Sequence, residues 1–114
     1  MTQAKLEAMF QAIDATDWGR AAELWHPEVE YDRPGFPLLV GKDAVHHFYR
    51  EIRMIRGRHE FEAFVIEGDR GACWGRFVGQ TVAGKPVDIQ FADCYRFKDS
   101  LLWRRKSYFF VPSI

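Results

Sequence analysis

The chain has 114 residues, of which 47% are hydrophobic, 28% charged and 16% aromatic. This length and composition fit one globular domain, residues 1–114, and exclude a disordered segment. Lys plus Arg number 16, as do Asp plus Glu, so no excess of charge points to nucleic acid or to an anionic membrane surface as a partner.

The first part of the chain has the apolar spacing of amphipathic helices. Apolar residues between Leu6 and Ile13 recur at helical spacing, and Thr2 is a candidate N-cap. A second short helix is predicted with Asp17, or Thr16, as its N-cap, running through Trp25 and ended by a His-Pro pair. We recognise no signal peptide and no apolar run long enough to span a bilayer, so we expect a cytoplasmic protein.

Short strands are predicted at 29–32 and 38–40, followed by a third helix that opens at Gly41, with Gly57 as its candidate C-cap. The period then changes, and further strands are predicted at 61–66, 72–82, 87–97 and 101–111. Helices followed by antiparallel strands define an α+β domain. We expect a curved, mostly antiparallel sheet wrapped around three N-terminal helices as a partly open cone.

The predicted strand at 87–97 is the most informative stretch, because one of its faces is apolar except for Asp93. A buried carboxylate is costly unless it is paired, hydrogen-bonded or protonated. A carboxyl group with a shifted pKa in an apolar pocket is also what acid–base catalysis uses. Asp93 is therefore a candidate catalytic residue, and the structural alternative is a strand twist that lets it reach water or an arginine.

The order of these elements resembles the nuclear transport factor 2-like superfamily, in particular the branch that holds ketosteroid isomerase and the SnoaL-like polyketide cyclases. The segments that carry the resemblance lie between the first two helices, across the first strand, on the third helix and on the last two strands. They are residues 14–18, 24–32, 41–49, 92–97 and 103–109. The resemblance covers nearly the whole chain and implies one SnoaL-like domain.

The resemblance implies roles for two aspartates. Asp32 falls where the isomerase keeps its general base. Asp93 falls where the isomerase keeps a protonated Asp that donates to the developing oxyanion, and where the cyclases are thought to keep their acid–base Asp. If the two face each other across an apolar pocket, the site holds a base and an acid at one pH.

The sequence departs from these relatives at three positions. Met9 stands near the isomerase's oxyanion-hole tyrosine, and Arg33 stands where the isomerase has a proline after its base. The limonene epoxide hydrolase branch, which uses an Asp-Arg-Asp arrangement, is disfavoured because Ser107 falls near its last-strand aspartate. Arg76 has no Asp two residues later, and it is a candidate ion-pair partner that would spoil the acid role of an aspartate.

Aromatic side chains are the candidate lining of the pocket, with core packing as the alternative. The residues predicted to contact a ligand are Trp18, Tyr31, Phe61, Trp74, Phe91 and Tyr95. Tyr95 shares a strand face with Asp93 and is the first candidate for the missing phenol donor. The histidines, His59 among them, lack zinc spacing and are expected at the surface or at caps, so we predict neither a metal nor a cofactor.

Three functions remain open. The first is a cofactor-free acid–base enzyme that isomerises, cyclises or dehydrates a hydrophobic polyketide, steroid-like or terpenoid compound through an enolate, using Asp32 and Asp93. The second is epoxide opening with the same aspartates. The third is a non-catalytic ligand-binding or dimerisation module, since one fold hosts many functions. The resemblance also implies a homodimer formed through the outer sheet face.

Overall fold

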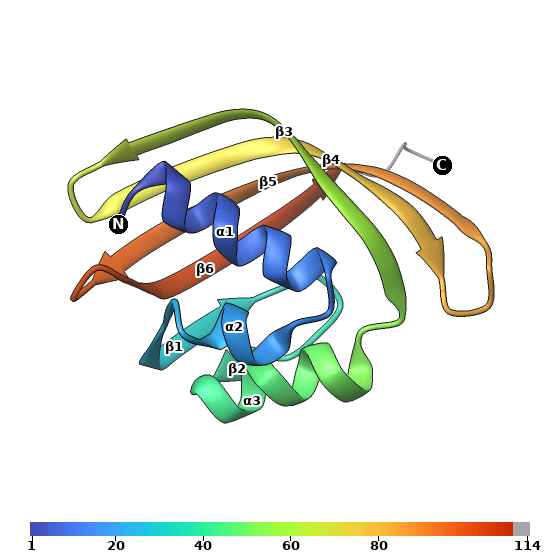
Figure 1. The fold of residues 1–114 in the computed structure, drawn as a ribbon, viewed down its shortest axis with the longest axis horizontal. Coiled ribbons are helices and arrows are strands. Elements are labelled where there is room, and N and C mark those ends of the chain that lie inside the picture. Colours follow the sequence, from blue (N-terminus) through green and yellow to red (C-terminus); the bar gives the residue numbers. More distant parts are fainter. Residues whose placement is uncertain (111–114) are drawn as a thin grey trace.

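Helices come first in the chain and long strands follow (Figure 1). The structure is a computed structural model that describes residues 1–110. Helix α1 (Gln3–Asp14) starts after Thr2, and α2 (Trp18–Ala22) starts after Asp17. Each of these two side chains accepts a backbone N–H from the first turn of its helix, so both predicted N-caps are confirmed.

The strands form one six-stranded sheet in the order β2-β1-β6-β5-β4-β3. Their bounds are β1 (Trp25–Asp32), β2 (Leu39–Val40), β3 (Ile55–Glu67), β4 (Arg70–Thr81), β5 (Pro86–Lys98) and β6 (Leu101–Phe110). β1 runs parallel to β6, and the other pairs are antiparallel. Residue 111, the last of the predicted strand, lies outside the described residues.

The predicted second helix is too long, because Trp25 pairs with Leu102 of β6 and so opens strand β1. The short helix α2 ends at Ala22 instead. A tryptophan at helical spacing also suits a strand, and the neighbouring β6 provides hydrogen-bonding partners that the short helix lacks.

The third helix begins as α3 (Lys42–His47) and continues as a π-helical turn, η1 (Phe48–Ile52). The turn closes where the Arg53 N–H donates to the Phe48 carbonyl at 2.8 Å. The predicted C-cap at Gly57 is wrong, because this residue lies inside β3. A Cβ there would overlap the backbone of Val78 on β4, so glycine permits the close approach of these two strands.

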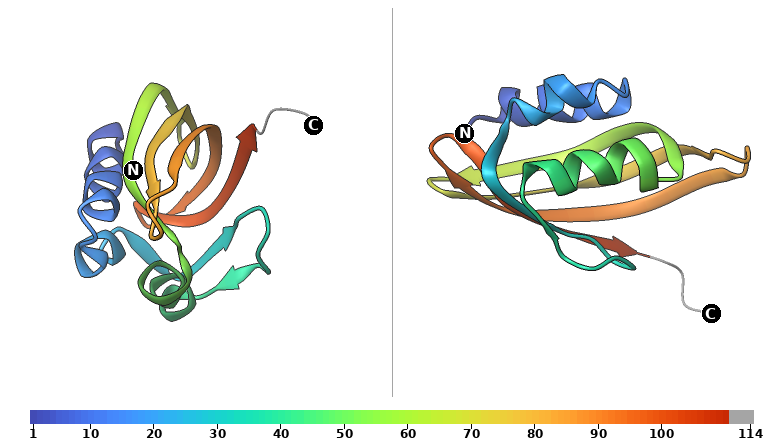
Figure 2. Two further views of the ribbon diagram at one scale, coloured as in Figure 1. Left: turned by 90° about the vertical axis from the view of Figure 1, so that its right-hand side faces the viewer. Right: turned by 90° about the horizontal axis from the view of Figure 1, so that it is seen from below.

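The long strands bend around α1, and α3 lies beside one end of the sheet (Figure 2). The apolar stripe of α1 is fully buried, and Phe48 and Tyr49 fill the core beneath β1. The α+β cone predicted from the sequence is thus the observed architecture. Within residues 1–110, none of the helices has the length and hydropathy needed to cross a membrane.

Candidate active site

Asp93 lies on the inner face of β5 and is 1% exposed. Its carboxylate accepts hydrogen bonds from Ser107 Oγ at 2.6 Å, Tyr95 Oη at 2.8 Å and Arg105 Nε at 3.0 Å. The guanidinium of Arg105 pairs with this carboxylate, and two hydroxyl groups hydrogen-bond to it. The structure thus shows the alternative in which Asp93 reaches an arginine, and that arginine is Arg105 rather than Arg76.

This ion pair belongs to a larger buried network. Arg105 Nη1 donates to Tyr49 Oη at 2.6 Å, and the Tyr31 hydroxyl lies 3.0 Å from Ser107 Oγ. Burial works to lower the pKa of Arg105, but the Asp93 carboxylate and the surrounding tyrosines raise it well above its ordinary value. The network links strands β1, β5 and β6 to η1, which makes it a structural connection between the sheet and the helix layer.

Asp32 points away from this network. On β1 and β6, Tyr31 pairs with Arg105 and Asp32 with Lys106, so Asp32 lies on the outer face of the sheet. Its side chain is 52% exposed and its carboxylate is 3.9 Å from the Lys106 amine. The prediction that Asp32 and Asp93 face each other across a pocket is wrong, because strand alternation sends the buried Tyr31 inward and its neighbour outward.

A cavity of about 40 Å³ lies inside the cone. Its polar lining is Arg33, Arg53, His59, Asp93 and Arg105, and its apolar lining is Ile55, Phe77, Ile89, Phe91 and Phe109. The volume is far below that of ordinary pockets for drug-sized ligands, about 300–1,000 Å³, because aromatic rings fill the rest of the cone. The cavity therefore has room for one small polar group of a ligand rather than for a steroid.

Only Phe91 of the aromatic residues predicted to contact a ligand lines this cavity. Tyr31 and Tyr95 belong to the buried network, where Tyr95 donates to Asp93. Phe61 packs against Phe91 with ring centroids 6.0 Å apart. The two tryptophans, Trp18 and Trp74, lie outside the cavity lining.

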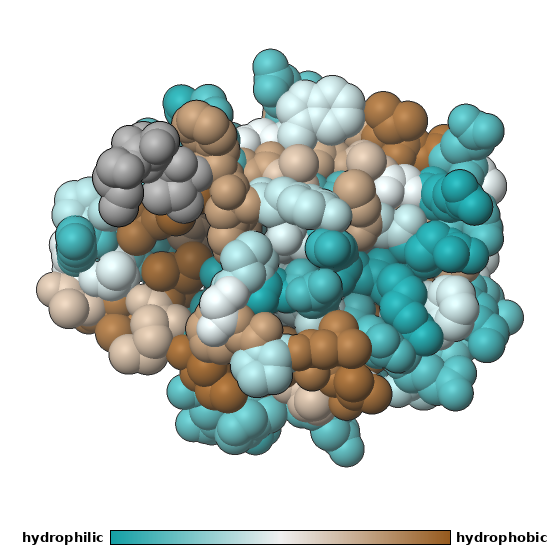
Figure 3. Space-filling model, turned by 180° about the vertical axis from the view of Figure 1, so that it is seen from behind, coloured by the Kyte–Doolittle hydropathy of each residue, from teal (hydrophilic) through white to brown (hydrophobic). Residues whose placement is uncertain are grey.

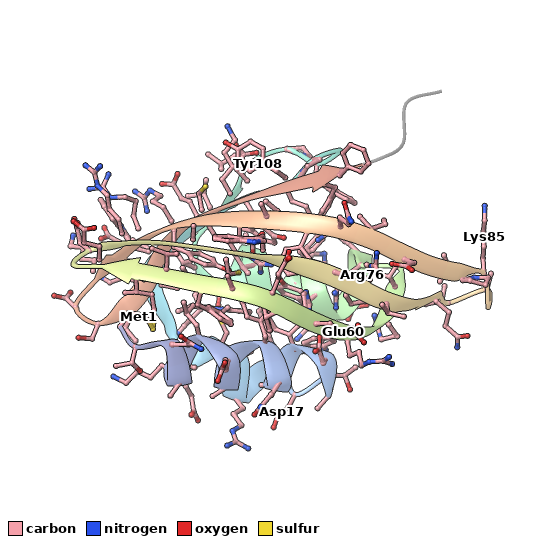
Figure 4. The ribbon with its side chains drawn as sticks, turned by 90° about the horizontal axis from the view of Figure 1, so that it is seen from above. Met1, Asp17, Glu60, Arg76, Lys85 and Tyr108 are labelled. Carbon is pink, nitrogen blue, oxygen red and sulfur yellow. The ribbon has the colours of Figure 1, made fainter. Side chains whose placement is uncertain are left out.

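Trp18 stacks on Tyr49 at 5.5 Å in the helix layer, and so its predicted role as a ligand contact in the cavity is wrong. Trp74 is 39% exposed on the outer sheet face, beside a groove of about 800 Å³. Arg76 and Tyr108 line the same groove, and both are labelled in Figure 4. Arg76 is paired there with Asp88 at 2.9 Å, which removes it from any role in the cone.

His59 lines the cavity, contrary to the prediction of a surface or capping histidine. Its side chain is 8% exposed, and its Nδ1 lies 2.6 Å from Asp14 Oδ1. The other Asp14 oxygen accepts the backbone N–H of His59 at 2.8 Å. Burial lowers the pKa of His59, against the opposing effect of Asp14, so the imidazole is neutral near pH 7.

This pairing fixes the tautomer of the imidazole. Asp14 accepts a hydrogen bond from the Nδ1–H group, so Nε2 carries the free lone pair. Aromatic rings hold the imidazole plane, since Phe10, Phe77 and Phe91 lie with their centroids 4.7, 5.0 and 5.4 Å away. The arrangement is that of an oriented general base.

Arg53 lines the cavity without a counter-ion. It is 5% exposed, and within residues 1–110 its buried Nε has no hydrogen-bond partner. Its guanidinium lies over the rings of Tyr49 and Phe77, 5.3 and 5.2 Å from their centroids. Burial lowers the pKa of Arg53, and the charges of Arg33 and Arg105 lower it further.

Arg33 also lines the cavity, and it follows β1 at the position where the isomerase has a proline. One of its nitrogens donates to Tyr31 Oη at 3.2 Å, while its Nε is buried and lacks a partner among residues 1–110. No carboxylate of the described residues lies within ion-pairing distance of either Arg33 or Arg53. The cavity therefore joins one neutral base to two arginines without counter-ions.

Part of this site had a signal in the sequence. Arg53 follows the buried Phe48 and Tyr49 by five and four residues, so helical spacing places it on the same side as these two rings. Arg33 was already a departure from the isomerase pattern. Asp14 and His59 are 45 residues apart on a helix end and a strand, so no local pattern brings them together.

The fold is that of the nuclear transport factor 2-like and ketosteroid isomerase-like proteins. The structure resembles an NTF2-like protein of unknown function from Burkholderia pseudomallei K96243, with a TM-score of 0.86 at 19% identity over 96% of this chain and 92% of that one. It also resembles a proposed SnoaL-like polyketide cyclase from Jannaschia sp. CCS1, with a TM-score of 0.81 at 15% identity over 93% of this chain and 83% of that one.

An LEH-like epoxide hydrolase of M. tuberculosis has the same fold, with a TM-score of 0.82 at 13% identity over 94% of this chain and 80% of that one. The family itself is defined by sequence, since the model of the SnoaL-like domain matches residues 6–105. The chain therefore belongs to the SnoaL-like domain family. None of the curated proteins matches it.

Proposed function

We propose that the protein is a cofactor-free acid–base enzyme of the SnoaL-like type in which His59, not an aspartate, is the general base. The observation that carries this proposal is the neutral imidazole at the cavity, oriented by the half-buried Asp14 carboxylate at 2.6 Å. The base needs to be neutral and fixed in one tautomer to accept a proton at pH 7.

The proton comes from a carbon next to a carbonyl group. His59 Nε2 takes this proton, and the electron pair of the broken C–H bond is delocalised onto the carbonyl oxygen, so that the substrate becomes an enolate. The positive charge of Arg53, which lies over the rings of Tyr49 and Phe77, stabilises the new negative charge. Return of the proton to another carbon gives isomerisation, and attack of the enolate carbon on a second carbonyl gives cyclisation, with the alkoxide taking the proton from His59.

Epoxide opening has weaker support. The epoxide hydrolase branch uses two aspartates around an arginine, whereas Arg105 of this chain contacts a single carboxylate, that of Asp93. The last-strand position is Ser107, which donates to that same carboxylate. The proposal therefore rests on proton transfer at carbon.

The test is exchange of carbon-bound hydrogen with D2O, followed by proton NMR on the enolisable acid α-ketobutyrate and its neutral amide. His59→Asn lowers the exchange rate at least about a hundredfold, the lower end for general acid–base catalysis, and Asp14→Asn lowers it less. Asp32→Asn, on the outer face, is the matched control and leaves the rate unchanged. Exchange that survives in folded His59→Asn overturns the proposal and favours the non-catalytic module.

A further inference from the structure

The charges around the cavity do not balance. Arg33, Arg53 and Arg105 line the cavity with three positive charges, while Asp93 lines it with one negative charge and His59 is neutral. Asp14 adds a second negative charge behind His59, where it forms an ion pair with neither Arg33 nor Arg53. One positive charge is left over in a largely buried site. An unpaired charge in a low-dielectric interior is costly, so the site lacks one negative charge.

We infer that the cone binds a ligand that is itself a monoanion, a small carboxylic acid whose carboxylate lies between Arg53 and Arg33. This inference deepens the proposed function, on which it rests for the site, by naming the class of substrate. Two guanidiniums in one small cavity present several N–H donors, and a carboxylate has the acceptor oxygens that match them.

The volume of the cavity agrees with this ligand. About 40 Å³ accommodates a carboxylate group but not a ring system. The half-buried apolar side chains of Ile55, Ile89 and Phe109 also line it, and they offer a surface for a hydrocarbon tail. The structure thus favours an acid with an alkyl or aryl tail, such as a keto acid, over a neutral polyketide or steroid.

Both arginines lie over aromatic rings, but neither has a carboxylate partner of the kind that Arg105 has. Asp93 already neutralises Arg105, whereas the buried Nε atoms of Arg33 and Arg53 have no partner among residues 1–110. An arginine that served only the core would be paired, as Arg105 is. Arg53 enters the cone because the π-helical turn ends at it, and such turns often occur at functional sites.

Binding is measured by isothermal titration calorimetry with butyrate and α-ketobutyrate, each against its amide. The acids bind and the amides do not. Arg53→Met and Arg33→Met each weaken binding of the acids about tenfold or more, as expected for a lost charged hydrogen bond. Arg53→Lys keeps part of the affinity. Arg76→Met, which removes an exposed arginine on the outer face, is the matched control and binds as the parent does.

Circular dichroism shows whether each variant is folded, and Arg53→Met is expected to melt no lower than the parent, because it removes an unpaired buried charge. Equal binding of acids and amides, no binding of either acid, or full affinity in folded Arg53→Met overturns the inference. The binding measurement also separates the carboxylate site from the proposed function. If the acids bind to His59→Asn normally but exchange no hydrogen in the parent, His59 is not a general base. The inferred carboxylate site is then still supported.

Discussion

Asp93 is the residue whose surroundings in the structure differ most from those predicted from the sequence. Its burial was predictable from the alternation of the strand, but its ion pair was not, because Arg105 is on the next strand and faces it only once β5 and β6 pair. The resemblance implied a neutral acid at this residue, whereas the structure places it in an ion pair with Arg105. A position in a fold therefore does not define the chemistry of its side chain.

Replacing one member of this pair tests its structural role. Asp93→Asn leaves Arg105 buried beside a neutral amide, and we expect a loss of about 3–5 kcal/mol in the free energy of unfolding, measured by urea denaturation. Asp32→Asn is the matched control, since its side chain is 52% exposed and its change stays within about 0.5 kcal/mol. An equal, small effect of both variants contradicts the structural role of the pair.

The lowered pKa of His59 makes the stability of the fold depend on pH. Burial lowers its pKa in the folded state, so between that pKa and the ordinary value of about 6.5 the unfolded chain binds more protons than the native one. The stabilising contribution is complete above about pH 6.5 and is lost as the pH falls below it. The sign is therefore a decrease in stability on acidification.

The measurement compares the parent with His59→Asn by urea unfolding between pH 7.5 and pH 5. The parent loses up to about 1.4 kcal/mol per pH unit relative to the variant, which has no proton to bind at that site. If the parent instead gains stability relative to His59→Asn on acidification, the Asp14 carboxylate, not burial, sets the pKa of the imidazole. That result would remove the neutral base from the proposed mechanism.

At the scale of elements, most of the helices and long strands could be predicted from periodicity. The ends of the second and third helices could not be predicted in this way. The end of α2 depends on the pairing of Trp25 with β6, which is distant in the sequence. The π-helical turn depends on how Phe48 and Tyr49 pack beneath β1, and neither local propensity nor spacing distinguishes it from an α-helical turn. Tertiary contacts decided both.

The curvature of the sheet depends on glycines where β3 and β4 meet. A Cβ on Gly75 would overlap the carbonyl oxygen of Glu60, so Gly75→Ala forces these strands apart and destabilises the fold by about 1–3 kcal/mol. Gly19→Ala in α2 is the matched control, because its Cβ meets nothing within 4 Å and alanine favours the helix. Melting curves of both variants that shift upward together would show that the strands adapt freely.

At the scale of the whole molecule, the outer face of the sheet remains without a partner among the described residues. Exposed aromatic side chains gather around its groove, with Trp74 39%, Tyr108 49% and Phe110 64% exposed. Seen from behind, the surface carries hydrophobic areas on either side of a hydrophilic band (Figure 3). Apolar patches of this kind mark interaction surfaces. Because the net charge is zero, electrostatic repulsion does not oppose self-association.

We expect this groove to be the contact between two copies of the chain, as the resemblance implied. Light scattering then gives a mass that rises with concentration toward twice the 13.4 kDa of the chain. Trp74→Glu places a charge in the apolar contact and keeps the protein monomeric. Val82→Glu adds the same charge on a side chain that is 59% exposed and lies outside the groove, so it leaves the dimer intact.

Because the cavity lies on the other face of the sheet, acid binding stays unchanged in both variants. A monomeric parent, or equal dissociation by both substitutions, contradicts this interface.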